Sequence, residues 1–532
     1  MPELETFYRL EVADDARAEA VASQLAAANG VAGAYVQPEP VLAVLAESDI
    51  NRAVPSADPA PPATPNFEPR QLYRAAAPGG VDVAFAWSVP GGRGAGVNVI
   101  DCEGAWRLTH EDLRQNQAGV IGPQTQDLQW RNHGTAVCSE IGGDLNGFGV
   151  TGIAPDATFR GSSIFGPGGL AAAIRAAADA LRAGDIILLE VQYGHPTRGF
   201  TSVEWWPADF AAIQYAVGRG VIVVEAAGNG GNNLDDVVYD TPLPGFPASW
   251  SNPFRRGARD SGAILVGAGA PPPGTHGRNW GPDRSRLDFS NYGSAVDVQG
   301  WGREVTAAGY GDLQGGANED LWYTDTFSGT SSASPIVVGV LACVQGARRA
   351  ARQTLLTPAS ARSLLRSTGS PQQDAPGRPA TQRIGNRPNL RALIRPKTSL
   401  ADGAAKKLRD DNGAKKRLDD GGGIKKRRDD VGVKKRVDDV KRPGFDLPPS
   451  GPADPGVGSG AEQPFILATP HHAGEDAATA AQADAVVAVA ARLAETDQAL
   501  AHAVALVARL EREREELAAQ LGALSHGETP VE

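Results

Sequence analysis

The sequence of 532 residues predicts an α/β domain in which helices cover both faces of a parallel sheet. Between residues 97 and 267, β-branched runs alternate with alanine-rich stretches of helical length. These runs are apolar at nearly every position, which is typical of strands buried on both faces of a parallel sheet. We therefore expect catalytic groups at the strand ends. The predicted strands are 97–101, 186–191, 221–226 and 263–267, and the predicted helices are 170–183 and 207–218.

Composition places this domain between two shorter N-terminal regions and two C-terminal ones. The main domain is predicted over 71–396, after a proline-rich stretch at 55–70 that indicates an extended linker. Residues 1–54 precede the linker and form a small α/β segment. Its elements are predicted as a strand over 7–12, a helix over 15–28 that stops at Asn29-Gly30, and a second strand over 31–36.

Beyond the main domain the composition changes twice. Residues 397–462 repeat a basic cluster and an acidic pair, then become rich in glycine and proline, and have almost nothing to bury. Such a stretch predicts an extended linker or docking tract. Residues 463–525 carry Val and Leu at heptad spacing, which predicts one long helix. This helix either associates with a second copy or another protein, or packs back on the main domain.

Charge and cysteine content exclude several classes of protein. The net charge of −11 and the acids interleaved with the basic repeats argue against a nucleic-acid partner. No run reaches transmembrane length, and the acidic start does not resemble a secretory signal, so no membrane association is expected. Three cysteines are too few for a disulfide framework. We expect a cytoplasmic protein.

Four polar residues lie where catalytic groups are expected. Ser331 lies at a loop-to-helix junction in the run Gly-Thr-Ser-Ser-Ala-Ser-Pro, and His133 begins a run of small residues. Asp101 ends a β-branched run, where a buried carboxylate needs a partner. Asn229 follows another such run between two glycines. Each residue alone could be structural, as a helix cap, a core histidine or a turn residue.

In their chain order, these motifs resemble those of the subtilisin-like serine peptidase family (subtilases). The resemblance covers about residues 71–395 and implies the family's parallel-sheet fold and a serine endopeptidase activity. It assigns Ser331 as nucleophile, His133 as general base and Asp101 as the acid that orients the imidazole. The Asn229 amide and the backbone N–H of Ser331 would stabilise the oxyanion.

Two stretches depart from the family pattern. Asp101 is followed by Cys102, Glu103 and Gly104, where the family has Ser or Thr and then Gly. We expect Glu103 to be solvated; if it points inward instead, it raises the pKa of His133. At the position of the family's substrate-binding strand, this chain has a different run of residues. We predict that Gln192, Tyr193 and Gly194 of this run bind substrate.

The N-terminal segment has two interpretations. It resembles a shortened form of the family's pro-region, which blocks the cleft until it is cut, and the proline-rich stretch 55–65 would be a suitable site for self-processing. The alternative is an accessory module that stays attached.

The sequence thus predicts a serine endopeptidase acting on polypeptide substrates. The alternative is an interaction protein that carries an inactive peptidase domain and is assembled by its C-terminal tail. Catalysis by this triad needs no cofactor, and no metal site is assigned. Structural calcium is common in the family, yet the acids in loop-like contexts have no recognisable spacing: Asp144, Asp235, Asp236 and Asp240.

Overall fold

In the computed structural model of the chain, the described residues are 7–10, 12, 15–28, 31–44 and 63–394. The charged linker 397–462 and the heptad-patterned helix 463–525 lie outside these residues and stay predictions, as does most of the proline-rich linker. The boundaries of the five regions likewise remain sequence predictions.

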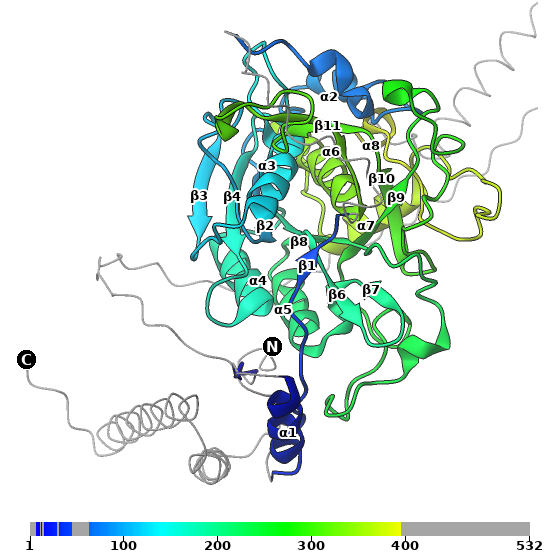
Figure 1. Ribbon diagram of the computed structural model, residues 1–532. Helices are drawn as coiled ribbons and strands as arrows, with labels where there is room; N and C mark the ends of the chain where they lie inside the picture. Colours follow the sequence, from blue (N-terminus) through cyan, green and yellow to red (C-terminus); the bar gives the residue numbers. More distant parts are fainter. Residues whose placement is uncertain (1–6, 11, 13–14, 29–30, 45–62, 395–532) are drawn as a thin grey trace, which may run out of the picture. The chain divides into compact units, whose positions relative to one another are not determined.

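The main domain is built on a seven-stranded sheet in which every neighbouring pair of strands is parallel (Figure 1). The order across the sheet is β10-β9-β8-β5-β2-β4-β3. This confirms the predicted α/β class. The strands are β2 Asn98–Glu103, β3 Gln117–Ile121, β4 Thr158–Ser163, β5 Ile186–Leu189, β8 Ile222–Ala226, β9 Ile264–Gly269 and β10 Val296–Trp301; β11 Val305–Ala308 and β12 Tyr323–Phe327 form a separate hairpin.

Helices cover both faces of the sheet, because each strand is apolar on both sides. Val99 packs with side chains of α3 and α6, whereas the next residue, Ile100, packs with side chains of α4 and α5. Every second residue of a strand faces the same layer. The helices of the main domain are α2 Val83–Trp87, α3 Leu128–Gly142, α4 Gly169–Ala180, α5 Pro207–Gly218, α6 Thr330–Ala350, α7 Pro358–Ser367 and α8 Leu390–Ile394.

The helix α6 runs through the middle of the domain. It is long and apolar enough to pass as a membrane span by composition, and its apolar stretch is fully buried within the domain. Its contacts with the sheet explain this apolarity: Ile336, Val340 and Val344 belong to the same hydrophobic core as the strand residues.

The N-terminal segment forms the helix α1 (Asp15–Ala26) and the two-residue strand β1 (Val41–Leu42). The strands predicted over 7–12 and 31–36 are not formed; their described residues contain only single bridge residues, Tyr8 and Gly33. Gly33 packs closely against the backbone of the loop at Gly245. β1 joins another small sheet, with β6 (Val191–His195) and β7 (Gly199–Thr201).

Candidate active site

Three elements bring the candidate catalytic groups together: the carboxyl end of β2, the first half of α3 and the amino end of α6. His133 Nε2 lies 2.9 Å from Ser331 Oγ. Both side chains are fully buried, and the His133 ring also makes an edge contact with Phe327. The sequence prediction of a histidine base beside a serine nucleophile therefore agrees with this geometry.

The carboxylate that contacts His133 is that of Glu103, which corrects the expectation that Glu103 is solvated. Glu103 Oε2 lies 2.7 Å from His133 Nδ1, and the Glu103 side chain is fully buried rather than solvated. Asp101 accepts instead a 2.8 Å hydrogen bond from Trp106 Nε1. The physical reason is the length of β2, which continues two residues beyond Asp101 and carries Glu103 to the strand end.

The two carboxyl groups share one buried face of β2. Burial raises the pKa of Glu103 well above its usual value. Burial, and then repulsion by Glu103, raises the pKa of Asp101 as well. Because both groups lie in a low-dielectric interior, two negative charges here are unfavourable, and the arrangement favours one ionised carboxylate at a time.

Close packing between β2 and α3 depends on a glycine. A Cβ placed on Gly134, the residue after His133, would lie 2.9 Å from Glu103 Oε1 and would collide with the backbone oxygen of Ala105. Only glycine lets α3 approach the strand end closely enough for the imidazole to meet Glu103. Thr135 adds to this contact, since its Oγ1 accepts a 2.9 Å hydrogen bond from the backbone of Arg107.

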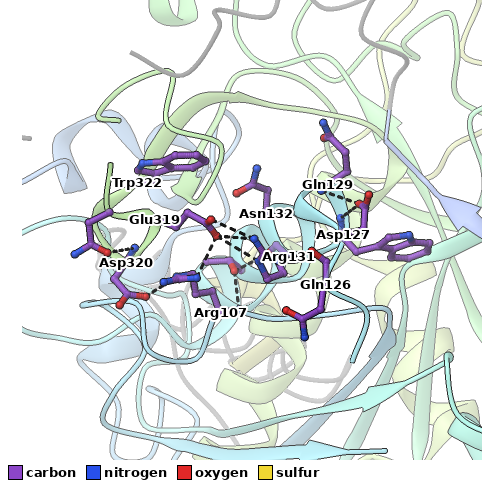
Figure 2. Close-up of polar contacts among 12 residues, drawn as sticks. Arg107, Gln126, Asp127, Gln129, Arg131, Asn132, Glu319, Asp320 and Trp322 are labelled. Atoms are coloured by element: carbon purple, nitrogen blue, oxygen red, sulfur yellow. Dashed lines mark hydrogen bonds and ion pairs between the residues drawn. The ribbon is translucent and has the colours of Figure 1, made fainter. Parts of the chain in front are cut away.

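The amino end of α3 is held by charged groups shown in Figure 2. Asp127 caps the helix and accepts hydrogen bonds from the first turn. Arg107 and Arg131 point toward the same carboxylate, that of Glu319, and each lies 3.1 Å from it. Two arginines from different segments thus fix the first turn of α3, and His133 lies on the next turn.

Asn229 connects the end of β8 to the start of α6. Its Oδ1 accepts hydrogen bonds of 2.9 Å from both the backbone N–H and the hydroxyl of Thr330. Its Nδ2 is buried and has no hydrogen-bond partner among the described residues. An oriented, unsatisfied amide donor beside the nucleophile is what oxyanion stabilisation requires.

The N-terminal segment lies in this centre. Ser331 Oγ donates a 2.6 Å hydrogen bond to the carbonyl oxygen of Ala43, and the backbone N–H of Ser331 lies 3.3 Å from the same oxygen. A Cβ placed on Gly329 would collide with this oxygen and would lie 3.2 Å from Asn229 Nδ2. The Ala43 carbonyl oxygen and the Asn229 side-chain amide therefore both lie next to Gly329.

Residues just before Ala43 bind as an added β-strand. β1 pairs antiparallel with β6, with Val41 opposite Gln192 and Leu42 opposite Val191. The side-chain amide of Gln192 donates a 3.0 Å hydrogen bond to the Leu42 carbonyl, and its oxygen accepts a 2.8 Å bond from the Asn229 backbone. Gln192 thus contacts both the bound strand and the residue that supplies the free amide.

The other two residues predicted to bind substrate have different surroundings. Tyr193 is buried, and its hydroxyl accepts a 2.8 Å hydrogen bond from Gln37, a residue farther back in the N-terminal segment. Gly194 pairs with Phe200 of β7 and contributes no side chain. Of the predicted set, Gln192 is the residue whose side chain hydrogen-bonds to the described part of β1.

The loop acids considered for calcium make contacts within the protein. Asp144 accepts backbone hydrogen bonds from Arg114 and Gln115, and Asp240 forms an ion pair with Arg255. Asp235 and Asp236 similarly accept hydrogen bonds from Ser294 and Val238. Across the described ranges, no group of three or more His, Cys, Asp or Glu is placed to hold a metal ion.

Sequence reasoning considered an inward Glu103 only as the alternative to a solvated one, and it gave Ala43 no role. A signal for Glu103 exists, because residues 101 and 103 share a face of any strand that includes both. No local pattern marks Ala43, since β1 has only two residues and forms by pairing with a distant edge.

A family model described as "Subtilase family" matches residues 107–391. The matched range includes His133, Asn229 and Ser331, and it begins after β2. M-protease of Shouchella clausii (strain KSM-K16) is 28% identical over 259 residues, which are 48% of this chain and 54% of M-protease. The chain therefore spans about half the length of that relative.

Subtilisin BL of Lederbergia lenta is also 28% identical over 259 residues, covering 48% of this chain and 77% of that protein. Among solved structures, one titled as proteases from Pseudoalteromonas arctica PAMC 21717 aligns with a TM-score of 0.43 and 22% identity. The alignment covers 62% of this chain and 99% of that one.

Proposed function

Because the chain belongs to the subtilase family, we propose that it is a serine endopeptidase that cleaves polypeptides through an acyl-enzyme intermediate. The observation that carries the proposal is the 2.9 Å contact between His133 Nε2 and Ser331 Oγ at the start of α6. A serine hydroxyl is a weak nucleophile until a base takes its proton, and His133 is positioned to do so.

The proposed reaction starts with attack of Ser331 Oγ on a peptide carbonyl carbon while its proton passes to His133 Nε2. The oxyanion formed is stabilised by the Ser331 backbone N–H and by Asn229 Nδ2, the buried donor that lacks a partner. His133 then gives the proton to the leaving amine as the peptide C–N bond breaks. Water attacks the acyl-enzyme while its proton passes to His133, and that proton returns to Ser331 Oγ as the acyl C–O bond breaks and the carboxylic acid leaves. This chemistry uses no cofactor.

We propose further that the first substrate is the chain itself, cut between Ala43 and Val44. The contacts of the Ala43 carbonyl with the Ser331 hydroxyl and backbone N–H support this bond, as does the pairing of β1 with β6. The proposal moves the cleavage site from the proline-rich stretch 55–65 to the end of the segment that occupies the cleft. Ala43 is fully buried, which favours a small apolar residue before the scissile bond.

Mass spectrometry of the purified full-length chain tests both proposals. We expect the native chain to release residues 1–43 and leave a product that begins at Val44, whereas Ser331→Ala stays intact. Ala43→Asp should slow this cut, because the buried site must desolvate a carboxylate. Val36→Asp is the matched control, since Val36 is exposed on the same segment.

The outcomes separate the two proposals. Cutting only within 55–65 would refute the Ala43–Val44 site and leave the peptidase assignment intact. A folded native chain that neither cuts itself nor reacts with a serine-directed phosphonate after removal of the N-terminal segment would refute the peptidase assignment. That second result would favour the alternative of an inactive, tail-assembled interaction protein.

The remaining expectations stand as proposals from sequence. We propose a cytoplasmic location, association through the helix predicted over 463–525, and no nucleic-acid or membrane partner. All three cysteines are free thiols buried in the domain, which agrees with a reducing compartment. Structural calcium remains unplaced.

A further inference from the structure

We infer that Glu103, and not Asp101, is the carboxylate that positions His133 for catalysis. The inference rests on the proposed peptidase function and concerns a residue that acts through the imidazole. Its basis is the 2.7 Å contact between Glu103 Oε2 and His133 Nδ1, on the opposite side of the ring from Ser331.

The strand geometry explains why Asp101 does not serve. Residues 101 and 103 lie on the same face of β2, and two residues advance a strand by about 6.5 Å. Asp101 therefore lies deeper in the sheet, opposite Leu188 of β5, whereas Glu103 extends past the end of β5 at Leu189. The strand end is where α3 crosses, so the residue nearest to His133 is Glu103.

The hydrogen bonds of Asp101 lead to the same conclusion. Its Oδ2 accepts the indole N–H of Trp106 at 2.8 Å, and its Oδ1 has no partner among the described residues. Turning Oδ2 toward His133 would leave the indole N–H unpaired in the interior, and the unengaged Oδ1 makes no hydrogen bond to the imidazole. Removing one partner from a buried pair is destabilising.

Glycines beside Glu103 leave room for its side chain. Gly134 leaves the volume beside Glu103 Oε1 empty of side chain. The next residue after Glu103 is Gly104, where a Cβ would press on the rings of Trp130 and Phe165. Glycines on both sides of the contact thus allow a glutamate, one methylene longer than aspartate, to reach the imidazole.

The role follows from the tautomer that catalysis needs. A carboxylate at Nδ1 holds the proton there and leaves the Nε2 lone pair free to accept the proton of Ser331. It also stabilises the imidazolium that forms. Replacing Glu103 with an amide keeps the shape and removes the charge, and loss of the matching charge in a serine peptidase triad lowers kcat about 10⁴-fold.

Proton NMR of the full-length Ser331→Ala chain tests the inference without requiring activity. A histidine Nδ1–H donated to a carboxylate gives a strongly downfield resonance, which should be present in the parent chain, absent from Glu103→Gln and retained in Asp101→Asn. Loss of the resonance in Asp101→Asn with retention in Glu103→Gln would overturn the inference. Because this signal does not depend on turnover, it can support Glu103 even if the peptidase proposal fails.

The second measurement is the rate of self-cleavage of chains that retain Ser331. We expect Glu103→Gln to lose about 10³- to 10⁴-fold in rate, Glu103→Asp to recover part of that loss, and Asp101→Asn to remain within about tenfold of the native rate. A Glu103→Gln rate near native would overturn the inference. So would a Glu103→Asp rate no better than that of Glu103→Gln, since restored charge should matter more than restored shape.

Discussion

His133 has two different neighbourhoods, one on the α6 side and one on the β2 side. On the α6 side the nucleophile is placed by backbone and neutral groups: the helix start, the Thr330–Asn229 hydrogen bonds and the turn at Gly329. On the β2 side the contact is made by carboxyl groups whose pKa values burial raises. In the part of the chain that the structure describes, each of these acids leaves one buried oxygen unpaired.

This difference indicates which kinds of mutation should impair each side of His133. The α6 side depends on covalent geometry and on donors that do not titrate in the working pH range. The β2 side depends on which carboxylate is ionised and on a close approach between a strand and a helix. Loss of the Ser331 hydroxyl on the first side should remove chemistry at nearly constant stability, whereas a change in packing at Gly134 on the second should alter activity together with stability.

The largest effect is expected on the α6 side, from Ser331→Ala. Without the hydroxyl no acyl-enzyme can form, and loss of the equivalent serine in subtilisin lowers kcat about 10⁶-fold. Hydrolysis of an unfolded protein substrate measures the loss, and urea unfolding should show little change in stability. Ser334→Ala is the matched control, because that buried hydroxyl donates to the Thr330 carbonyl in the same helix and does not contact His133. Residual activity within tenfold of native would place the nucleophile elsewhere.

Asn229→Ala should have the next largest effect. It removes the free amide donor together with the Oδ1 that accepts two hydrogen bonds from Thr330, so urea unfolding accompanies the kinetics. Loss of one such donor in subtilisin lowers kcat about 10²- to 10³-fold. Steady-state kinetics should show the loss mainly in kcat, because the oxyanion exists only after attack. A rise in KM of similar size with kcat unchanged would mean that Asn229 binds the substrate ground state. That result would weaken the contrast between the α6 side and the β2 side.

The fold and the α6 side could be predicted from the sequence because their signals are local. Apolar runs alternating with helical stretches define the sheet, and the run around Ser331 marks the point where a helix begins. The β2 side could not be resolved in this way, since a strand repeats every second residue and presents Asp101 and Glu103 on one face. Choosing between them needs the position of α3, which depends on contacts such as Gly134 against Ala105. No local sequence pattern indicates that Ala43 contacts Ser331.

Gly134→Ala should disrupt the contact between Glu103 and His133 by forcing α3 away from β2. The added methyl would press on Glu103 Oε1 and on the Trp106 ring, and overpacking of this kind destabilises by about 1–3 kcal/mol. Self-cleavage should fall well beyond what the stability loss explains, because the Glu103–His133 contact is displaced. Gly142→Ala on the same helix is the control, since its Cβ would meet nothing closer than 3.9 Å. Equal behaviour of the two variants would show that the approach of α3 to β2 is not critical.

The smallest effect, a pH-dependent change in stability, comes from Asp101→Asn. The pKa of Asp101 is raised in the fold by burial and by Glu103, so the folded chain keeps a proton that the unfolded chain releases above about pH 3.8. Asp101 therefore contributes most to stability below that pH and progressively less as the pH rises toward its folded pKa. Asparagine does not titrate and can still accept the Trp106 indole N–H. Urea unfolding of the Ser331→Ala chain with and without Asp101→Asn should show the variant gaining stability relative to its parent between pH 5 and pH 8. A flat difference over this range would mean that the pKa of Asp101 is not raised in the fold, as for an anion held by a partner such as His133.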